Sequence, residues 1–213
     1  MIYIAKTAEV EHPENISNSA RVCENAKVYD FAQIYGDARI DENAVVYEHA
    51  EVFERASVYG NAEVYGRAHI YGIAIVCADA EVFGKASVYG NARVYGDAEV
   101  YGNAKVYDQV WVYDNATIFD NAEVYGNAWV YENAEIYDNA AVCGKAEVFG
   151  DAQVYDNAKV FDGAWVCDHA LVCGDAQVFS DAKVCDYTIV CENANVKKGE
   201  FEGWLVICGK AEV

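Results

Sequence analysis

The stretch NARVYGDAEVYG, residues 91–102, contains one six-residue unit twice, in the form Ala-x-Val-Tyr-Gly-Asn/Asp. From Ala20 to Ala194 this unit occurs thirty times without an insertion or a deletion. Its third position is Val or Ile in every unit, and its first position is Ala in all but two, Val110 and Thr188. An unbroken short period is typical of a solenoid, in which each coil contacts only its neighbours.

Each unit has the pattern of a short strand followed by a corner. Its Ala and Val lie two positions apart, so on an extended strand they point to the same side, while the residue between them and the following aromatic point to the other side. The next two residues, Gly or Asp and then Asn or Asp, tolerate the positive φ of a tight corner. Three strands and three corners close a triangular coil of eighteen residues.

A small residue followed two positions later by an aliphatic one resembles the hexapeptide-repeat family of left-handed parallel β-helices. The family's acyltransferases usually place Gly directly after the aliphatic residue, whereas this chain places Tyr, Phe or Cys there. That departure is similar to an aromatic-rich group of bacterial and phage repeat proteins described as acetyltransferase-like. The prediction is an all-β, single-stranded, three-sided parallel β-helix with about eleven coils of eighteen residues. Its left-handedness is implied by the resemblance alone.

The period ends near the C-terminus of the chain. We expect residues 1–196 to form the hexapeptide-repeat β-helix, because the phase breaks between Lys197 and Trp204, one residue short of the period. Residues 197–213 are predicted to form a C-terminal cap and a partial last coil, with Phe201 and Trp204 folding over the end. Otherwise one or both ends would stack on another copy, since a solenoid end exposes strand edges.

The composition limits the classes of partner. A net charge of -20 argues against binding to nucleic acid or to an anionic membrane, since both require basic residues. No apolar stretch approaches the ~20 residues that span a bilayer, and the start MIYIAKTAEV has no signal-peptide pattern. These features predict a cytoplasmic protein with reduced cysteines. No basic residue lies between Lys105 and Lys145, so an acidic rod that mimics nucleic acid toward a basic protein is an alternative.

Residues eighteen apart should stack in columns along the rod. The position after Val is Tyr, Phe or Cys in twenty-eight of the thirty units, with Asp41 and Lys197 as the exceptions. We expect these rings to stack at strand spacing. A corner column of asparagines should bond along the axis through its side-chain amides. This column consists of Asn103, Asn121, Asn139 and Asn157.

One outward column departs from the charged and polar residues found elsewhere. It holds Trp111, Trp129 and Trp165, interrupted by Glu147, and the column beside it holds Tyr95, Tyr113, Tyr131 and Phe149. Exposed aromatic patches usually mark contact surfaces. We therefore predict a binding surface here, most simply for lateral self-association. Carbohydrate stacking and a surface without a partner are the alternatives.

The cysteines and histidines give weaker signals. No C-x-x-C motif is present, so no metal site is predicted, although Cys167 with Cys185 and Cys173 with Cys191 share columns at a spacing that permits disulfides. The resemblance implies a histidine general base between subunits of a trimer. Of His12, His49, His69 and His169, the best-placed is His69, which projects from a flat face. None has a neighbouring motif, and a base without a pocket is not an active site.

These features favour a non-catalytic β-solenoid without cofactors that acts as a rigid scaffold or as a self-associating protein-interaction module. A hexapeptide-family acyltransferase is the enzymatic alternative. The regularity of the repeat supports the first hypothesis, because active sites usually interrupt regular structure.

Overall fold

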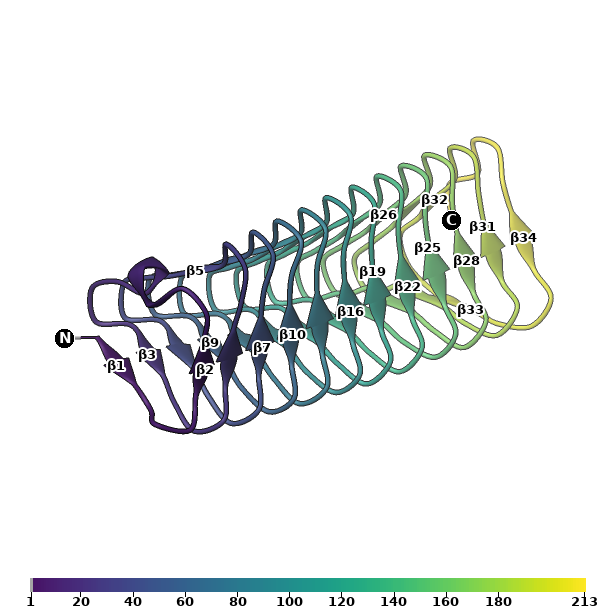
Figure 1. Ribbon diagram of the computed structural model, residues 1–213. Coiled ribbons are helices and arrows are strands. Elements are labelled where there is room, and N and C mark those ends of the chain that lie inside the picture. Colours follow the sequence, from purple (N-terminus) through teal and green to yellow (C-terminus); the bar gives the residue numbers. More distant parts are fainter. Residues whose placement is uncertain (1) are drawn as a thin grey trace.

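The computed structural model describes residues 2–213 as a rod of stacked three-sided coils (Figure 1). Strands of two residues recur at every sixth residue from Arg21 to Val196, and all the strands assemble into three parallel sheets, one along each side of the rod. Between β2 (Glu9–Val10) and β3 (Arg21–Val22) the chain forms a short 3-10 helix, η1 (Pro13–Asn15). The predicted all-β solenoid of about eleven turns of eighteen residues is confirmed.

Sheets A and B each contain twelve strands, and sheet C contains ten. In sheet A they are β1 (Tyr3–Ile4), β3 (Arg21–Val22), β6 (Arg39–Ile40), β9 (Ser57–Val58), β12 (Ile75–Val76), β15 (Arg93–Val94), β18 (Trp111–Val112), β21 (Trp129–Val130), β24 (Glu147–Val148), β27 (Trp165–Val166), β30 (Lys183–Val184) and β33 (Glu200–Phe201). In sheet B they are β2 (Glu9–Val10), β4 (Lys27–Val28), β7 (Val45–Val46), β10 (Glu63–Val64), β13 (Glu81–Val82), β16 (Glu99–Val100), β19 (Thr117–Ile118), β22 (Glu135–Ile136), β25 (Gln153–Val154), β28 (Leu171–Val172), β31 (Ile189–Val190) and β34 (Val206–Ile207). In sheet C they are β5 (Gln33–Ile34), β8 (Glu51–Val52), β11 (His69–Ile70), β14 (Ser87–Val88), β17 (Lys105–Val106), β20 (Glu123–Val124), β23 (Ala141–Val142), β26 (Lys159–Val160), β29 (Gln177–Val178) and β32 (Asn195–Val196).

Neighbouring coils pair in an unchanging register of eighteen residues through the main repeat. Lys105, for example, pairs with Glu123. The backbone N–H groups of Lys105 and Tyr107 donate to the next coil at 2.9 and 3.0 Å, and that of Asn103 does so at the corner at 2.6 Å. In Figure 1 the nearer strands, those of sheet B, run upward while the coils advance from left to right, so the coil is left-handed.

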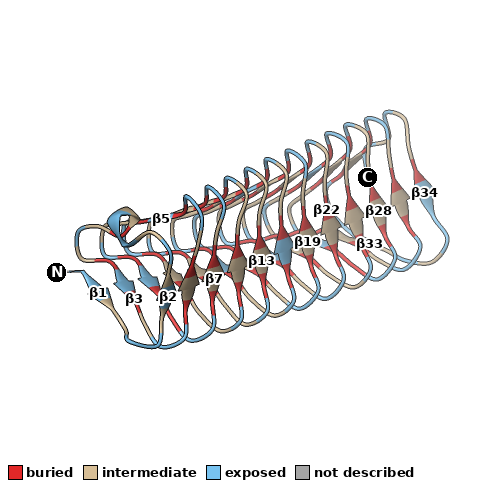
Figure 2. Cartoon of the chain, in the orientation of Figure 1, coloured by how far each residue is buried: buried red, intermediate tan, exposed pale blue. Residues whose placement is uncertain are grey.

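The core runs along the whole axis of the rod. From Ala20 to Ala164, the inward Ala and Val or Ile side chains are at most 2% exposed, so buried residues recur at the same places in every coil (Figure 2). Thr188, which replaces an inward Ala, is also fully buried, and its Oγ1 donates to the Phe201 carbonyl oxygen at 3.1 Å. The interior is therefore filled by one small and one branched aliphatic side chain from each strand.

The corners use a left-handed residue immediately after the aromatic position. Gly102 has φ 70°, and Asp108 and Asp120 have φ 64° and 56° in the equivalent places. The following Asn or Asp takes another role, since its side chain stacks on the corner of the next coil. The predicted amide column is confirmed, because Asn103 donates to Asn121 at 3.1 Å and Asn121 donates to Asn139 at 3.3 Å.

The coil continues beyond the break in the repeat. β33 pairs with β30 and β34 pairs with β31, but both pairings have a separation of seventeen residues. The missing residue falls between β32, which keeps the register of eighteen, and β33. Phe201 therefore takes the inward position that Val184 holds one coil earlier, and its side chain packs against the core. Within residues 2–213 no helix is long and apolar enough to cross a bilayer.

The narrow core leads to a first prediction. Ala140 is fully buried, whereas its neighbour Ala141 points outward from β23. We expect Ala140→Leu to lower the free energy of unfolding by about 1–3 kcal/mol, because a larger side chain overpacks the interior. Ala141→Leu should change it by less than about 0.5 kcal/mol. Urea denaturation followed by circular dichroism measures both changes, and equal shifts for the two variants would contradict the assigned interior.

Candidate functional site: the tryptophan face

The predicted aromatic surface lies on sheet A. Trp111, Trp129 and Trp165 are the first residues of β18, β21 and β27, and they point outward because the following Val fills the core. Trp111 pairs in register with Trp129, and Glu147 pairs with both Trp129 and Trp165. Together with Tyr95, Tyr113, Tyr131 and Phe149, these three residues are called the Trp face below.

Trp111 is half-buried, whereas Trp129 and Trp165 are exposed. The rings of Trp111 and Trp129 stack with centroids 5.5 Å apart and an interplanar angle of 16°. Trp129 and Trp165 are 41% and 38% exposed, so more than a third of each side chain remains in contact with solvent. An apolar, rigid and pre-stacked surface loses little conformational entropy when a partner covers it.

A second aromatic column supports the indoles from the side. Tyr95, Tyr113, Tyr131 and Phe149 stack in succession with centroid separations of 5.1, 4.9 and 4.9 Å. Tyr95 meets the edge of Trp111 at 6.1 Å, and Phe149 meets the edge of Trp165 at 6.2 Å. The predicted ring stacking is confirmed, and the edge contacts fix the indoles at both ends of the face.

Two cations border the Trp face, and the sequence analysis missed them. The guanidinium of Arg93 lies 4.9 Å from the Trp111 ring, and the Lys183 ammonium lies 4.9 Å from the Trp165 ring. Both are cation–π distances. Their signal was present in the sequence, because Arg93 lies eighteen residues before Trp111 and Lys183 eighteen residues after Trp165. The face therefore combines partly exposed indoles with a cation at each end, and the Lys183 cation is also ion-paired with Glu200 at 2.9 Å.

Carboxylates of adjacent coils hold several of the stacked tyrosines. The Tyr35 hydroxyl donates to Glu51 at 2.9 Å, and the Tyr47 hydroxyl donates to Glu63 at 3.2 Å. Burial and then the hydrogen bond to Glu51 raise the pKa of Tyr35 to about 12. Burial and then the electrostatic repulsion from the Tyr95 phenol group raise the pKa of Tyr113 to about 12. The neutral phenols are thus part of the folded structure.

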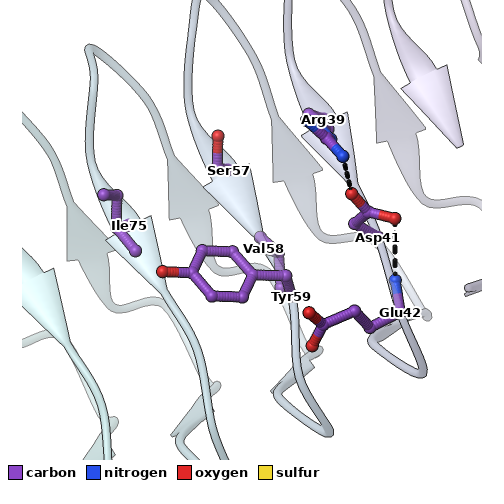
Figure 3. A pocket seen from close by; sticks show the side chains of 7 residues that line it. All are labelled: Arg39, Asp41, Glu42, Ser57, Val58, Tyr59 and Ile75. Atoms are coloured by element: carbon purple, nitrogen blue, oxygen red, sulfur yellow. Dashed lines mark hydrogen bonds and ion pairs between the residues drawn. The ribbon is translucent and has the colours of Figure 1, made fainter. Parts of the chain in front are cut away.

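Sheet A also carries a hollow on the N-terminal side of the Trp face. This depression has a volume of about 280 Å³. The short side chain of Ser57 lies there between Arg39 and Ile75 (Figure 3). Asp41 replaces an aromatic residue, is 7% exposed, and forms an ion pair with Arg39. Its other oxygen accepts the Glu42 backbone N–H at 3.0 Å. The hollow exists because the short side chains of Ser57 and Asp41 stand beside the larger Arg39, Tyr59 and Ile75. The Asp41 carboxylate already neutralises Arg39.

Several acidic residues between Lys105 and Lys145 have local partners. The carboxylates of Asp108 and Glu132 accept the corner N–H groups of Gly126 and Gly150 at 3.1 and 2.9 Å. Glu123 forms an ion pair with Lys105 at 2.8 Å. These carboxylates stabilise the stacking of coils, which is a structural explanation for part of the acidic stretch.

The four histidines lie apart from one another. His69 occupies a flat strand position of sheet C between Glu51 and Ser87. His49 stacks on Phe31 at 5.1 Å, and Phe31 also faces His12 at 6.4 Å. His169 stacks on Tyr187 at 4.9 Å and lies 3.3 Å from an Asp151 carboxylate oxygen. The structure therefore brings no second histidine to His69.

The cysteines depart from the expectation of reduced thiols. Cys167 is joined to Cys185, and Cys191 is joined to Cys208, with Cα separations of 4.6 and 4.7 Å. The prediction was wrong for these four because adjacent coils place the paired residues within disulfide distance. The carboxylate of Asp168 lies within 4.8 Å of the Cys167 and Cys185 sulfurs, but sulfurs bonded to each other are not thiolate ligands.

The two residues predicted to cap the rod occupy different environments. Phe201 lies in β33 and is packed against the core. Trp204 is 86% exposed and stacks on Tyr187 with centroids 4.4 Å apart. The two rings therefore lie on opposite sides of the coil wall, one inside and one outside.

Comparison with known proteins agrees with the fold. The family model described as YdcK Beta solenoid repeat matches residues 32–48, 86–102 and 152–168. Each matched segment begins at an inward Ala and spans nearly one coil, and together they cover well under half of the chain. The chain is a β-solenoid repeat protein. No curated protein and no solved structure matches it.

The stacked tyrosines give a second prediction. Because the pKa of Tyr35 and Tyr113 is raised to about 12 in the fold, from about 10 in an unfolded chain, the neutral phenols contribute stability that is present below pH 10. That contribution is lost as the pH rises toward 12. The phenolate absorbance should therefore appear at a higher pH in the native protein than in the urea-unfolded protein. Coincident titration curves would show that the rings are not held as neutral phenols.

Proposed function

We propose that the solenoid is a rigid, non-catalytic interaction module that self-associates through the Trp face. The observation that carries the proposal is the stacked pair Trp111–Trp129 on a flat sheet, with Trp129 and Trp165 more than a third exposed. Clusters of Trp and Tyr often supply most of the binding energy of a protein interface. The β-solenoid supplies the rigid support, because every residue behind the face belongs to the packed core.

A second copy of the chain is the occupant that the charges favour. Arg93 places positive charge at one end of the face, whereas Lys183 at the other end is ion-paired with Glu200 at 2.9 Å. Glu147 lies between Trp129 and Trp165 on the same face. In an antiparallel pair whose two-fold axis passes between Trp111 and Trp129, Arg93 of one copy would face Glu147 of the other, and Trp111 would face Trp129.

Two alternatives remain as proposals of lower rank. Membership of the hexapeptide-repeat superfamily would favour an acyltransferase, with His69 as the candidate base. An acyltransferase of this kind should bind acetyl-CoA. An acidic rod that mimics nucleic acid predicts salt-sensitive binding to a basic protein. Stable association of two copies in the absence of any cofactor or basic partner would favour the interaction module.

The proposal includes a cytoplasmic location. Disulfides in that compartment are usually transient and redox-active. The two disulfides of this chain would therefore have to be reducible there.

The third prediction concerns the Trp face. The double substitution Trp111→Ser and Trp129→Ser should weaken self-association by at least about tenfold, since loss of a central aromatic cluster costs ~2 kcal/mol or more. Light scattering across a concentration series measures the mass. The matched control is Trp204→Ser, which removes an exposed indole that lies off sheet A and should leave the mass unchanged.

Two outcomes would overturn the proposal. A wild-type protein that stays monomeric at all concentrations would exclude self-association. An unchanged mass for the double variant would show that association uses another surface. Circular dichroism of each variant confirms that the solenoid is intact, and titration with acetyl-CoA tests the acyltransferase alternative in the same samples.

A further inference from the structure

Three cysteines follow one another along a single column of sheet B. Cys173, Cys191 and Cys208 come directly after strands β28, β31 and β34. The strands pair in register, because Val172 lies opposite Val190, and Val190 lies opposite Ile207. The one-residue shortening of the last coil is what brings Cys208 into this column, since it lies seventeen residues after Cys191.

Cys191 therefore has a sulfur neighbour on each side. It is bonded to Cys208, with a Cα separation of 4.7 Å, while Cys173 is a partly exposed free thiol. The backbone contacts on the two sides are equivalent, since Cys173 N donates to Val190 O and Cys191 N donates to Ile207 O, both at 2.9 Å. Adjacent strands lie about 4.8 Å apart, so Cys173 is also within disulfide distance of Cys191.

We propose that this column is a thiol–disulfide exchange site in which Cys191 alternates between Cys208 and Cys173. Cys173 releases its proton to water, and its thiolate attacks the Cys191 sulfur. The Cys173–Cys191 bond forms as the Cys191–Cys208 bond breaks. Cys208 leaves with the electron pair as a thiolate and takes a proton from water. The number of disulfides does not change, so the step needs no oxidant or reductant.

The column also provides the direction of attack. The three cysteines follow one another along the axis of the rod, so Cys173 and Cys208 lie on opposite sides of Cys191. Displacement at a disulfide sulfur proceeds through such an in-line arrangement. Tyr155 occupies the same column one coil before Cys173. A hydrogen bond with Cys173 is the main cause that raises the pKa of Tyr155, so the phenol contacts the attacking thiol.

The other cysteines differ in their neighbours. Cys167 and Cys185 also share a column, but the residues beyond them are Phe149 and Glu202, so one disulfide is the single arrangement available. Cys143 lies between Tyr125 and Phe161 in its column. Alternative pairing therefore belongs to the column of Cys173, Cys191 and Cys208.

The exchange would give the protein two forms that differ in which cysteine of the column is a free thiol. With Cys191 bonded to Cys208, the coil that contains β34 is covalently tied to the one before it. With Cys191 bonded to Cys173, Cys208 becomes a thiol that can react with an external disulfide. The chemical class of partner is a small-molecule disulfide or a disulfide on another protein.

The fourth prediction uses disulfide mapping. The full-length protein is equilibrated in a buffer of reduced and oxidised glutathione, quenched with acid, alkylated and digested with trypsin and Asp-N. Cleavage at Asp168, Lys183, Asp186 and Lys198 leaves Cys167, Cys173, Cys185, Cys191 and Cys208 on separate peptides. We expect the wild type to yield both the Cys191–Cys208 and the Cys173–Cys191 linkages, and Cys208→Ser to yield the Cys173–Cys191 linkage.

Matched variants keep the test falsifiable. Cys173→Ser should retain the Cys191–Cys208 linkage, which shows that the fold is intact. Cys191→Ser should leave Cys173 and Cys208 unlinked within the chain, because two strand spacings of ~9.6 Å exceed disulfide distance. The proposal is overturned if Cys208→Ser keeps Cys173 and Cys191 as free thiols in a buffer that oxidises Cys191 and Cys208 of the wild type. Loss of the Cys167–Cys185 linkage in the same digest would instead report unfolding.

Discussion

The structure depends on one constraint, the pairing of two-residue strands between coils in a fixed register. A strand of two residues forms too few bonds to be stable alone, so each one requires partners in the coils on either side. The inward Ala and Val side chains set that register, because a shift of one residue would turn the branched side chains into water. Burial of these side chains along the whole rod shows how completely the interior is specified.

Because the interior is fixed, chemical variation is confined to the outward positions and the corners. A residue at such a position lies next to the residue eighteen positions later, so each position forms a column along the rod. Two side chains of the same type in successive coils therefore contact each other. Stacked rings, amide chains and a disulfide between coils all arise in this way. The Trp face and the cysteine column are therefore products of the same register, although their chemistry is unrelated.

This regularity explains how much of the structure could be predicted from the sequence. Arithmetic with a period of eighteen placed Trp111 over Trp129 and Asn103 over Asn121, as the structure shows. It failed for Cys208, because a single missing residue changes the separation to seventeen and the sequence does not reveal where pairing resumes. It also left open which side of the coil Phe201 would occupy, because that depends on the resumed register.

Columns whose residues change from coil to coil allow a rod of repeats to bind a partner in one defined register. A perfectly periodic surface offers a partner equivalent positions one coil apart, so the partner can slide at little cost in free energy. The order Arg93, Trp111, Trp129, Glu147, Trp165, Lys183 has no repeat along sheet A. A partner displaced by one coil would place an indole against a charge, and an unpaired charge in an interface is costly. The positions that break the repeat are thus the ones able to specify a single mode of association.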